Sequence, residues 1–285
     1  MPLVHAISDP RDPRLAPYAN LKDAELRRRE FAGEHGVFIA ESELVVRALL
    51  ASPYDVHSVL ATRAMAERLA GAIGERERVR SSVTVIVAPE GVLQSVIGFG
   101  FHRGVLAAGV RGEQPPLDML LGCTSLTILE GIGNHDNVGG IFRNVSALGG
   151  ERPGVILGPG CCDPLYRKAI RVSAGHVLHV PWRVEEDLPA LAGRLRGAGW
   201  VVLAMTPAGA RSLDELGPVA KPAVLLGAEG PGLTPEAIGA ADVSVRIPMR
   251  AGVDSLNVGV AGALALARLA GGAGNGANPP PARAS

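Results

Sequence analysis

Three short segments of this chain place polar side chains in glycine-rich surroundings, where a ligand could approach the backbone. They are Asn137-Val-Gly-Gly-Ile-Phe-Arg143, Leu226-Gly-Ala-Glu-Gly-Pro-Gly232 and Asp254-Ser-Leu-Asn-Val258. Each follows an apolar, strand-like run, and ligands of open α/β folds bind at the carboxyl ends of parallel strands. We therefore expect the three segments to form one polar site, although they lie far apart in the sequence.

The first segment carries an amide, Asn137, and a guanidinium, Arg143, nearly two helical turns apart. Asn137 is well placed to cap a helix. Gly139 and Gly140 would then lie in the first turn, where each costs up to about 1 kcal/mol relative to alanine. We therefore expect a packed backbone or a ligand close to this turn. The alternative is a capped, tightly packed helix with Arg143 on its surface.

The second segment holds one carboxylate, Glu229, and the third holds Ser255 and Asn257. The second segment lacks the Gly-Lys-Ser/Thr ending of a nucleotide-phosphate loop. Two alternatives stay open at this point. The second segment could be an ordinary turn with Glu229 in an ion pair, and Asp254 or Ser255 could simply cap a helix.

The 28 basic and 28 acidic residues balance, so any polyanionic partner must be held by local patches. All but three of the basic residues are arginines, whose planar guanidinium groups suit phosphate. Two patches are candidates for phosphate contacts: Arg27 with Arg28, and Arg167 with Arg171, which are four residues apart on one helical face. Solvated helix faces are the alternative for both.

Several classes of protein are disfavoured. The cysteines, Cys123, Cys161 and Cys162, form neither a disulfide framework nor a metal-binding pattern, so we expect a reduced, cytoplasmic protein. The histidines show no metal spacing, and we expect no metal ion. No apolar run approaches the roughly 18 residues that a membrane span needs. Gly131-x-Gly133 lacks the third glycine of a dinucleotide fingerprint, which argues against a nucleotide-dependent oxidoreductase.

Alternating strand and helix signals predict the elements that must position these side chains. In the first third we expect strands at 37–40, 56–61, 83–87 and 104–110, and helices at 41–51, 62–73 and 90–96. Residues 111–116, with two adjacent prolines, predict an extended connector between domains. Further on we expect strands at 125–130, 154–157, 177–180, 200–205, 223–226 and 243–247, and a closing helix at 256–269. This alternation predicts an α/β fold with a mainly parallel sheet covered on both faces.

In their order and spacing, the three segments resemble the motifs of the SpoU/TrmH family of RNA ribose 2′-O-methyltransferases, part of the SPOUT superfamily. Asn137 to Arg143 is similar to the first motif and Leu226 to Gly232 to the second. Ile247-Pro-Met followed by Ser255-Leu-Asn-Val258 is similar to the third. The resemblance covers residues 124–270. Residues 1–112 resemble, more loosely, the family's ribosomal-protein-like RNA-binding domain.

The resemblance implies an RNA substrate-binding domain at 1–112 and a methyltransferase domain at 113–271. The composition of residues 272–285, rich in glycine, alanine and proline, predicts a disordered tail. It also implies a C-terminal trefoil knot that binds S-adenosylmethionine, and a homodimer with the site at its interface. Carried over by motif, the expected catalytic residues are Asn137, Arg143, Glu229, Ser255 and Asn257. The expected cofactor-binding residues are Thr206, Leu226, Gly227, Ile247, Met249 and Leu256.

The function that follows from the resemblance is methyl transfer from S-adenosylmethionine to a ribose 2′-hydroxyl of structured RNA. The extra N-terminal domain favours ribosomal RNA over transfer RNA. The alternatives are a transfer RNA 2′-O-methyltransferase, methylation of a base, and a non-catalytic RNA-binding protein on the same fold. The intact set of polar residues argues against the last, and the Ser-Leu-Asn run favours ribose.

Overall fold

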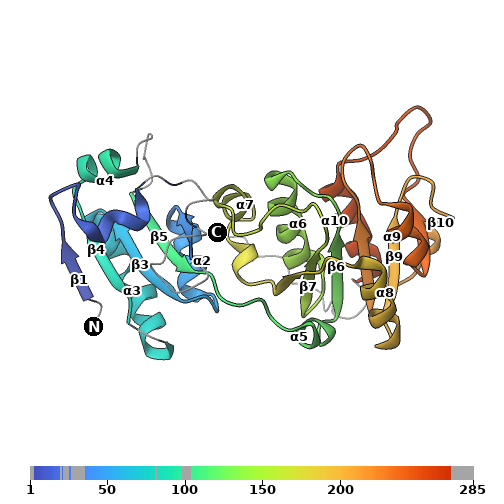
Figure 1. Ribbon diagram of the computed structural model, residues 1–285, viewed down its shortest axis with the longest axis horizontal. Coiled ribbons are helices and arrows are strands. Elements are labelled where there is room, and N and C mark those ends of the chain that lie inside the picture. Colours follow the sequence, from blue (N-terminus) through green and yellow to red (C-terminus); the bar gives the residue numbers. More distant parts are fainter. Residues whose placement is uncertain are drawn as a thin grey trace, which may run out of the picture. The chain divides into compact units, whose positions relative to one another are not determined.

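The computed structural model of the chain describes residues 3–19, 21, 26, 36–80, 82–97 and 104–270 (Figure 1). Predictions about Arg27, Arg28 and the 272–285 tail lie outside these residues. The chain forms two compact units, which divide between Gln114 and Pro115, inside the 111–116 segment. Two later segments, 138–140 and 162–179, group with the first unit.

A five-stranded mixed sheet forms the centre of the first unit, in the order β1-β4-β3-β5-β2. The strands are β1 (Leu3–Ala6), β2 (Val37–Glu41), β3 (Val56–Ala61), β4 (Thr84–Val87) and β5 (Val105–Val110). β1, β4 and β3 run parallel, whereas β5 pairs antiparallel with β3 and β2. The helices are η1 (Pro13–Tyr18), α2 (Glu43–Ala51), α3 (Arg63–Val79), α4 (Glu90–Ile97), α7 (Arg167–Val172) and η2 (His176–Leu178). The sequence predicts β2 to β5 within two residues but misses β1 and η1.

One polar group lies deep in the core of this unit. Tyr18 is fully buried, and its hydroxyl donates to the carbonyl oxygen of Ser58 at 2.9 Å. Burial raises the pKa of Tyr18 well above its ordinary value, although the hydrogen bond of its hydroxyl with the Ser58 side chain, at 2.8 Å, opposes this shift. The phenol therefore stays neutral, and its burial is tolerated because its hydroxyl has a partner.

The second unit is built on a seven-stranded sheet in the order β10-β12-β9-β11-β6-β7-β8, in which every pairing is parallel. The strands are β6 (Ser125–Leu129), β7 (Pro153–Leu157), β8 (Trp182–Val184), β9 (Val201–Met205), β10 (Arg211–Ser212), β11 (Pro222–Leu226) and β12 (Val243–Arg246). The helices are α5 (Leu117–Leu121), α6 (His135–Leu148), α8 (Leu188–Gly197), η3 (Leu213–Glu215), α9 (Pro235–Ala240) and α10 (Val258–Leu269). The predicted α/β fold with a parallel sheet is thus confirmed.

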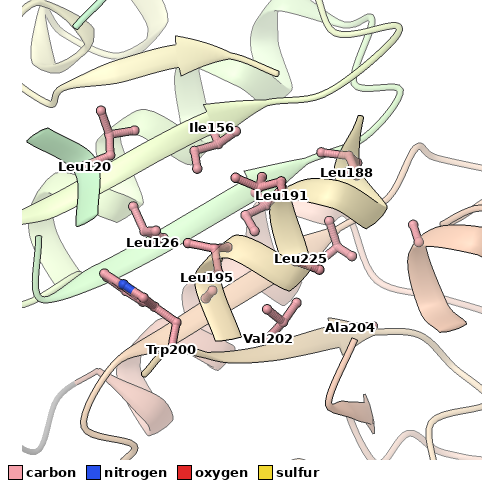
Figure 2. Close-up of a cluster of buried hydrophobic side chains, with 14 of the residues drawn as sticks. Leu120, Leu126, Ile156, Leu188, Leu191, Leu195, Trp200, Val202, Ala204 and Leu225 are labelled. Carbon is pink, nitrogen blue, oxygen red and sulfur yellow. The ribbon is translucent and has the colours of Figure 1, made fainter. Parts of the chain in front are cut away.

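Helices cover both faces of this sheet. On one face, Leu191 and Leu195 of α8 pack in a buried cluster with alternate residues of the strands, as Figure 2 shows for Leu126, Leu225 and Val202. α10 covers the opposite face, because a Cβ at its Gly262 would come within 2.8 Å of Leu226, the neighbour of Leu225 on β11. Leu126 and Leu225 lie on β6 and β11, which are neighbours in the middle of the sheet. The loops that follow these two strands therefore start from the buried core.

One predicted strand is wrong. Residues 177 and 178 belong to a 3₁₀ turn, η2, and residues 179 and 180 follow it as a turn and a bend, so no strand forms here. Gly175 precedes this turn with φ +85°, and a Cβ there would come within 2.6 Å of Ala48 Cβ. Pro181 then separates the turn from β8, which begins at Trp182. Val177, Leu178 and Val180 are buried, as residues of a central strand would be. They are buried because the turn packs against the unit, and they do not pair with a strand of a sheet.

The N-cap residue of α2, Ser42, has a strained backbone conformation. Ser42 has φ 89° and ψ 154°, a backbone region that is almost exclusive to glycine and costs about 1–3 kcal/mol for other residues. Because its side chain makes no capping hydrogen bond, Ser42→Gly removes strain and loses little. We expect this substitution to raise the free energy of unfolding by about 1 kcal/mol, measured by urea denaturation.

Ser52, at the other end of the same helix, is a matched control. Its φ is −82°, and its hydroxyl donates to the carbonyl of Leu49 at 2.8 Å and accepts from the amide of Tyr54 at 3.2 Å. Ser52→Gly should therefore lower the free energy of unfolding by about 1 kcal/mol. A loss of stability in Ser42→Gly would show that the strain at Ser42 is offset by contacts of its side chain.

Candidate active site

The loops that follow β9, β11 and β12 line one cavity of about 690 Å³ at the carboxyl edge of the parallel sheet. All six residues predicted to bind a cofactor line it: Thr206, Leu226, Gly227, Ile247, Met249 and Leu256. Two of the predicted catalytic residues, Glu229 and Ser255, line it as well. The structure therefore gathers these residues around one space, and their roles there stay predictions.

Asn257 joins the three predicted segments by hydrogen bonds. Its Nδ2 donates to Asn137 Oδ1 at 3.0 Å and to Glu229 Oε1 at 2.9 Å. Its Oδ1 accepts from the backbone amides of Gly259 and Val260 at 3.0 and 3.3 Å. A side-chain amide has two N–H donors and one carbonyl oxygen, so every polar atom of this group has a partner. We call Asn137, Glu229 and Asn257 the amide cluster.

The side chain of Asn257 also caps the N-terminus of α10. Asn257 is its N-cap, so neither Asp254 nor Ser255, the alternatives considered from the sequence, has that place. An N-cap side chain contributes about 1 kcal/mol to a helix. The predicted start of the helix at Leu256 is two residues early, because the cap lies at Asn257. Asp254 and Ser255 instead face the cavity.

The first segment forms the start of α6, but not as predicted. The N-cap is Asn134, whose side chain accepts from the amide of Asp136 at 2.9 Å, and Asn137 lies inside the first turn. The prediction that Asn137 caps this helix is therefore wrong. Gly139 is required by close packing, since a Cβ there would lie 2.7 Å from the carbonyl oxygen of Ala169 on α7. Gly140 faces open space.

Arg143 is not part of the amide cluster. Asn144, seven residues after Asn137 and on the same face of α6, donates to the carbonyl of Gly259 at 2.8 Å and so points at α10. Arg143 lies about 100° around the helix from Asn144. Its side chain is exposed, and among the described residues it has no hydrogen bond or ion pair. The guanidinium is thus available to a ligand outside the cavity.

Glycine is needed in the second segment because the loop folds tightly on itself. A Cβ at Gly227 would lie 2.4 Å from the backbone carbon of Gly232, and Gly230 and Gly232 have φ of +88° and +76°. The amide of Gly232 donates to the carbonyl of Ala228 at 3.0 Å. This loop carries Glu229 on the wall of the cavity, so the alternative of an ordinary turn with Glu229 in an ion pair does not describe it.

The cavity is acidic. Of the described residues that line it, only Glu229 and Asp254 are charged. A cation is therefore favoured inside and a phosphate is disfavoured.

Beside the end of β6, burial raises the pKa of the Cys161 thiol, whose Sγ donates to the carbonyl of Leu129 at 3.4 Å. This thiol is protonated at neutral pH and is not a nucleophile.

The remaining predicted site residues lie elsewhere. Arg167 and Arg171 fall on α7, in the first unit, where Arg171 is exposed and Arg167 half-buried. No cluster of three or more histidine, cysteine or acidic residues that could hold a metal ion occurs in the described ranges. Within the same ranges, no helix has the length and apolar character to cross a membrane.

Sequence reasoning missed two contacts that build the site. The carboxylate of Glu130, at the end of β6, accepts from both the amide and the hydroxyl of Thr234 at 2.8 Å. Asn144 holds the first turn of α10, as described above. A signal existed for Asn144, which stands two helical turns after Asn137. For Glu130 there was none, because its partner lies 104 residues away.

Comparison with known proteins adds independent findings. The model of the SpoU rRNA Methylase family matches residues 125–267. A protein named as an uncharacterized tRNA/rRNA methyltransferase of Mycobacterium tuberculosis is 42% identical over 271 residues, which cover 92% of this chain and 90% of that protein. An AdoMet-bound rRNA methyltransferase from Sinorhizobium meliloti shares the fold, with a TM-score of 0.73 at 23% identity, covering 92% of this chain and 96% of that one. The SpoU methyltransferase AviRb from Streptomyces viridochromogenes has a TM-score of 0.72 at 18% identity, covering 90% and 95% of the two chains.

The amide cluster can be tested by Asn257→Asp. A carboxylate caps a helix as well as an amide does, so α10 should keep its cap. The substitution removes both donors and puts a negative charge within hydrogen-bond distance of Glu229, which raises the pKa of the introduced carboxyl. A raised pKa in the folded state means that stability is lost as pH rises above the unfolded value of about 4. Urea unfolding should show the variant close to wild type at pH 4 and about 1 kcal/mol less stable at pH 8.

Asn134→Asp is the matched control, because Asn134 caps α6 through the amide of Asp136 and its side chain makes no other hydrogen bond in the described structure. This variant should show no comparable loss between pH 4 and pH 8. Equal pH dependence of the two variants would mean that Glu229 and Asn257 do not interact in solution.

Proposed function

Since the chain belongs to the SpoU rRNA Methylase family, we propose that it transfers a methyl group from S-adenosylmethionine to a ribose 2′-hydroxyl of RNA. The observation that carries the proposal is the acidic cavity beside the amide cluster, which joins side chains of all three predicted segments. The name of the Sinorhizobium meliloti structure supports the choice of cofactor, since that related fold was crystallised with AdoMet.

The residues around the cavity fit this cofactor in size, polarity and charge. A volume of about 690 Å³ lies within the range of about 300–1,000 Å³ for small-molecule sites. Apolar side chains of Leu226, Ile247 and Leu256 would hold the adenosyl part. The carboxylates of Glu229 and Asp254 suit a ligand that carries positive charge on its sulfonium and amino groups.

When bound, S-adenosylmethionine supplies an electrophilic methyl group, so the chain itself has to orient the ribose hydroxyl and provide for its proton. Asn257 uses its donors on Asn137 and Glu229, and it therefore fixes the cluster instead of binding the substrate. Asn137 Nδ2 and Ser255 Oγ have no hydrogen-bond partner among the described residues. We assign these two groups to the ribose hydroxyls.

Arg143 acts on the nucleotide from outside the cavity. A guanidinium group is always protonated in proteins and is a poor base, so Arg143 does not remove the proton itself. Its exposed, unpaired side chain on α6 suits a phosphate of the RNA backbone, within the described surroundings of that helix. By binding the phosphate next to the reacting ribose, Arg143 stabilises the negative charge that develops on the hydroxyl oxygen. The proton passes to the phosphate or to water.

Ribosomal RNA is our preferred substrate over transfer RNA, and we place the protein in the cytoplasm with it. The first unit contributes none of the described residues that line the cavity, and this second folded unit supports a structured RNA that is recognised at more than one point. Arg171, exposed on α7 of that unit, is our candidate for one of these contacts. The relatives named tRNA/rRNA methyltransferases are consistent with either RNA, so transfer RNA is the alternative.

We also propose a homodimer whose interface includes α10. Leu256, Val260 and Leu264 follow one another at four-residue spacing and are 36%, 49% and 44% exposed. Such a stripe of large apolar side chains is suited to a second copy of the chain. Because Leu256 also lines the cavity, a partner on this stripe would reach the margin of the site.

The trefoil knot of the family is part of the same proposal. α10 packs on β11, and the amide of Val219, just before β11, donates to the carbonyl of Leu269 at the end of α10 at 3.0 Å. Segments that precede β11 and follow β12 are thus adjacent, as a chain that passes through its own loop requires.

The function predicts that the full chain methylates RNA from a strain that lacks this protein. With tritiated S-adenosylmethionine, label should enter the RNA, and nuclease digestion should release it as a 2′-O-methyl nucleoside. Arg143→Ala should lower turnover by at least about 100-fold, the usual effect of removing one charge-stabilising donor. Its affinity for S-adenosylmethionine, measured by calorimetry, should stay within about twofold of wild type, because Arg143 does not line the cavity.

Arg194→Ala is the control for the loss of an arginine, since Arg194 is exposed on α8, on the opposite face of the sheet from α10. It should retain wild-type turnover. Labelled bases instead of ribose would replace the proposed reaction by base methylation. No label and no cofactor binding would leave a non-catalytic RNA-binding protein.

The proposed dimer predicts that a charged substitution in the stripe formed by Leu256, Val260 and Leu264 lowers the mass of the protein in solution. Leu264→Glu should convert the protein to a monomer in sedimentation experiments, because a buried charge without a partner costs several kcal/mol. Met119→Glu is the control, since Met119 is 58% exposed on α5, away from the stripe. A wild-type protein that sediments as a monomer at micromolar concentration, or an unchanged dimer in Leu264→Glu, would remove α10 from the interface.

A further inference from the structure

One residue holds both ends of the glycine-rich loop that forms a wall of the cavity. The backbone amide of Glu130 donates to the carbonyl of Leu226 at 2.9 Å, immediately before the loop at residues 227–233. The carboxylate of Glu130 accepts two hydrogen bonds from Thr234, which follows the loop immediately. The Thr234 amide donates to Oε2 and the Thr234 hydroxyl donates to Oε1, each at 2.8 Å. Glu130 thus contacts the chain both where it leaves β11 and where it enters α9, and so holds these two points relative to each other.

This loop determines the shape of the cavity. Its residues from Gly227 to Leu233 all belong to the lining, and it carries Glu229, which connects the loop to Asn257. Internal contacts give the loop its own fold, namely the approach of Gly227 to Gly232 and the hydrogen bond between Gly232 and Ala228. These contacts do not attach its far end to the rest of the unit. The buried side chain of Leu233, which belongs to the core cluster, and the carboxylate of Glu130 do so.

We propose that Glu130 is a positioning residue for cofactor binding: by holding Thr234, it keeps the 227–233 loop in the conformation that fits S-adenosylmethionine. The inference rests on the proposed function of this cavity. It adds a residue that lies outside the lining and acts through Thr234. Preorganised loops bind more tightly because less conformational freedom is lost on binding.

A purely structural role for the same contact is the competing explanation. Thr234 is the N-cap of α9, its hydroxyl accepts from the amide of Ala237 at 3.2 Å, and a carboxylate near a helix N-terminus stabilises the helix. On that explanation, loss of the carboxylate lowers the stability of α9 and leaves the affinity of a folded protein for its cofactor unchanged. Cofactor affinity therefore separates the two explanations.

The experiment compares Glu130→Gln, Thr234→Val and Thr234→Ser in the full chain. Glutamine keeps the shape of the side chain but offers Thr234 only one good acceptor, and valine removes the hydroxyl. In calorimetric titration with S-adenosylmethionine, we expect Kd to rise about tenfold in Glu130→Gln and in Thr234→Val. The double variant should be no weaker than Thr234→Val, because both substitutions act on the contact between Glu130 and the Thr234 hydroxyl, and the capping hydrogen bond that valine also removes is absent from both of these variants. Thr234→Ser, which keeps the hydroxyl, should bind like wild type.

Turnover gives a second readout. At saturating cofactor, kcat of Glu130→Gln should stay within about threefold of wild type while KM for S-adenosylmethionine rises with Kd, since the bound cofactor itself fills the cavity and holds the loop. A general loss of stability would lower the fraction of active protein and leave KM unchanged.

Asp242→Asn is the matched control. Asp242 also accepts a backbone amide, that of Val202, at 2.8 Å, and its Oδ1 accepts from Arg196 Nε at 2.7 Å, but it does not line or adjoin the cavity. These hydrogen bonds and the Arg196 charge hold the pKa of Asp242 below its ordinary value against the opposing effect of burial, which is the largest single influence. This variant should lose stability and keep wild-type Kd.

Each outcome decides a different claim. Wild-type Kd in Glu130→Gln, together with normal binding by the wild-type protein, overturns the positioning role and leaves the proposed function intact. No binding of S-adenosylmethionine by the wild-type protein overturns the proposed function itself. An equal rise of Kd in Asp242→Asn would show that cofactor affinity follows overall stability, which also overturns the positioning role.

Discussion

The hydrogen bonds of the Asn257 side chain are the constraint on which the site depends. One amide group satisfies two acceptors, Asn137 and Glu229, and two helix amides, so its orientation is fixed from both sides. Exchange of its oxygen and nitrogen would place its single oxygen against the oxygens of Asn137 and Glu229, and its NH₂ group against the N–H donors of Gly259 and Val260. The start of α10, the start of α6 and the loop after β11 are therefore held in one arrangement, although they lie up to 120 residues apart.

Local signals explain why much of the fold follows from the sequence. The runs that form β9 and β11 are continuous and apolar because helices cover both faces of the sheet, and this pattern is visible without a structure. The errors arise where burial has another cause. Residues 177–180 are apolar because a turn packs there, and the cap of α6 is Asn134 because its side chain reaches the amide of Asp136. Contacts such as Glu130 with Thr234 have no local signature at all.

The glycines of the three segments have different physical causes, which the sequence alone cannot separate. At Gly139 the cause is the backbone of α7, whose carbonyl at Ala169 leaves no room for a Cβ. At Gly227 the cause is the fold of its own loop, and Gly140 has open space around it. The prediction that a backbone or a ligand approaches the start of α6 is thus met by a backbone at Gly139, whereas no described protein atom other than those of its neighbours in α6 lies within 4 Å of a Cβ at Gly140.

The distribution of charge in the second unit constrains how an RNA could use the cavity. The lining carries two carboxylates and no described basic residue, while the exposed guanidinium of Arg143 lies outside the lining, on α6. A phosphate is repelled from the interior of the cavity and attracted to the guanidinium. A positively charged ligand is therefore favoured inside the cavity, and a negatively charged ligand is favoured at Arg143. A nucleotide bound at Arg143 would keep its phosphate in solvent and could present only its uncharged sugar or base towards the amide cluster. Because the whole chain is neutral, this sorting has to come from the placement of a few groups and not from the overall field.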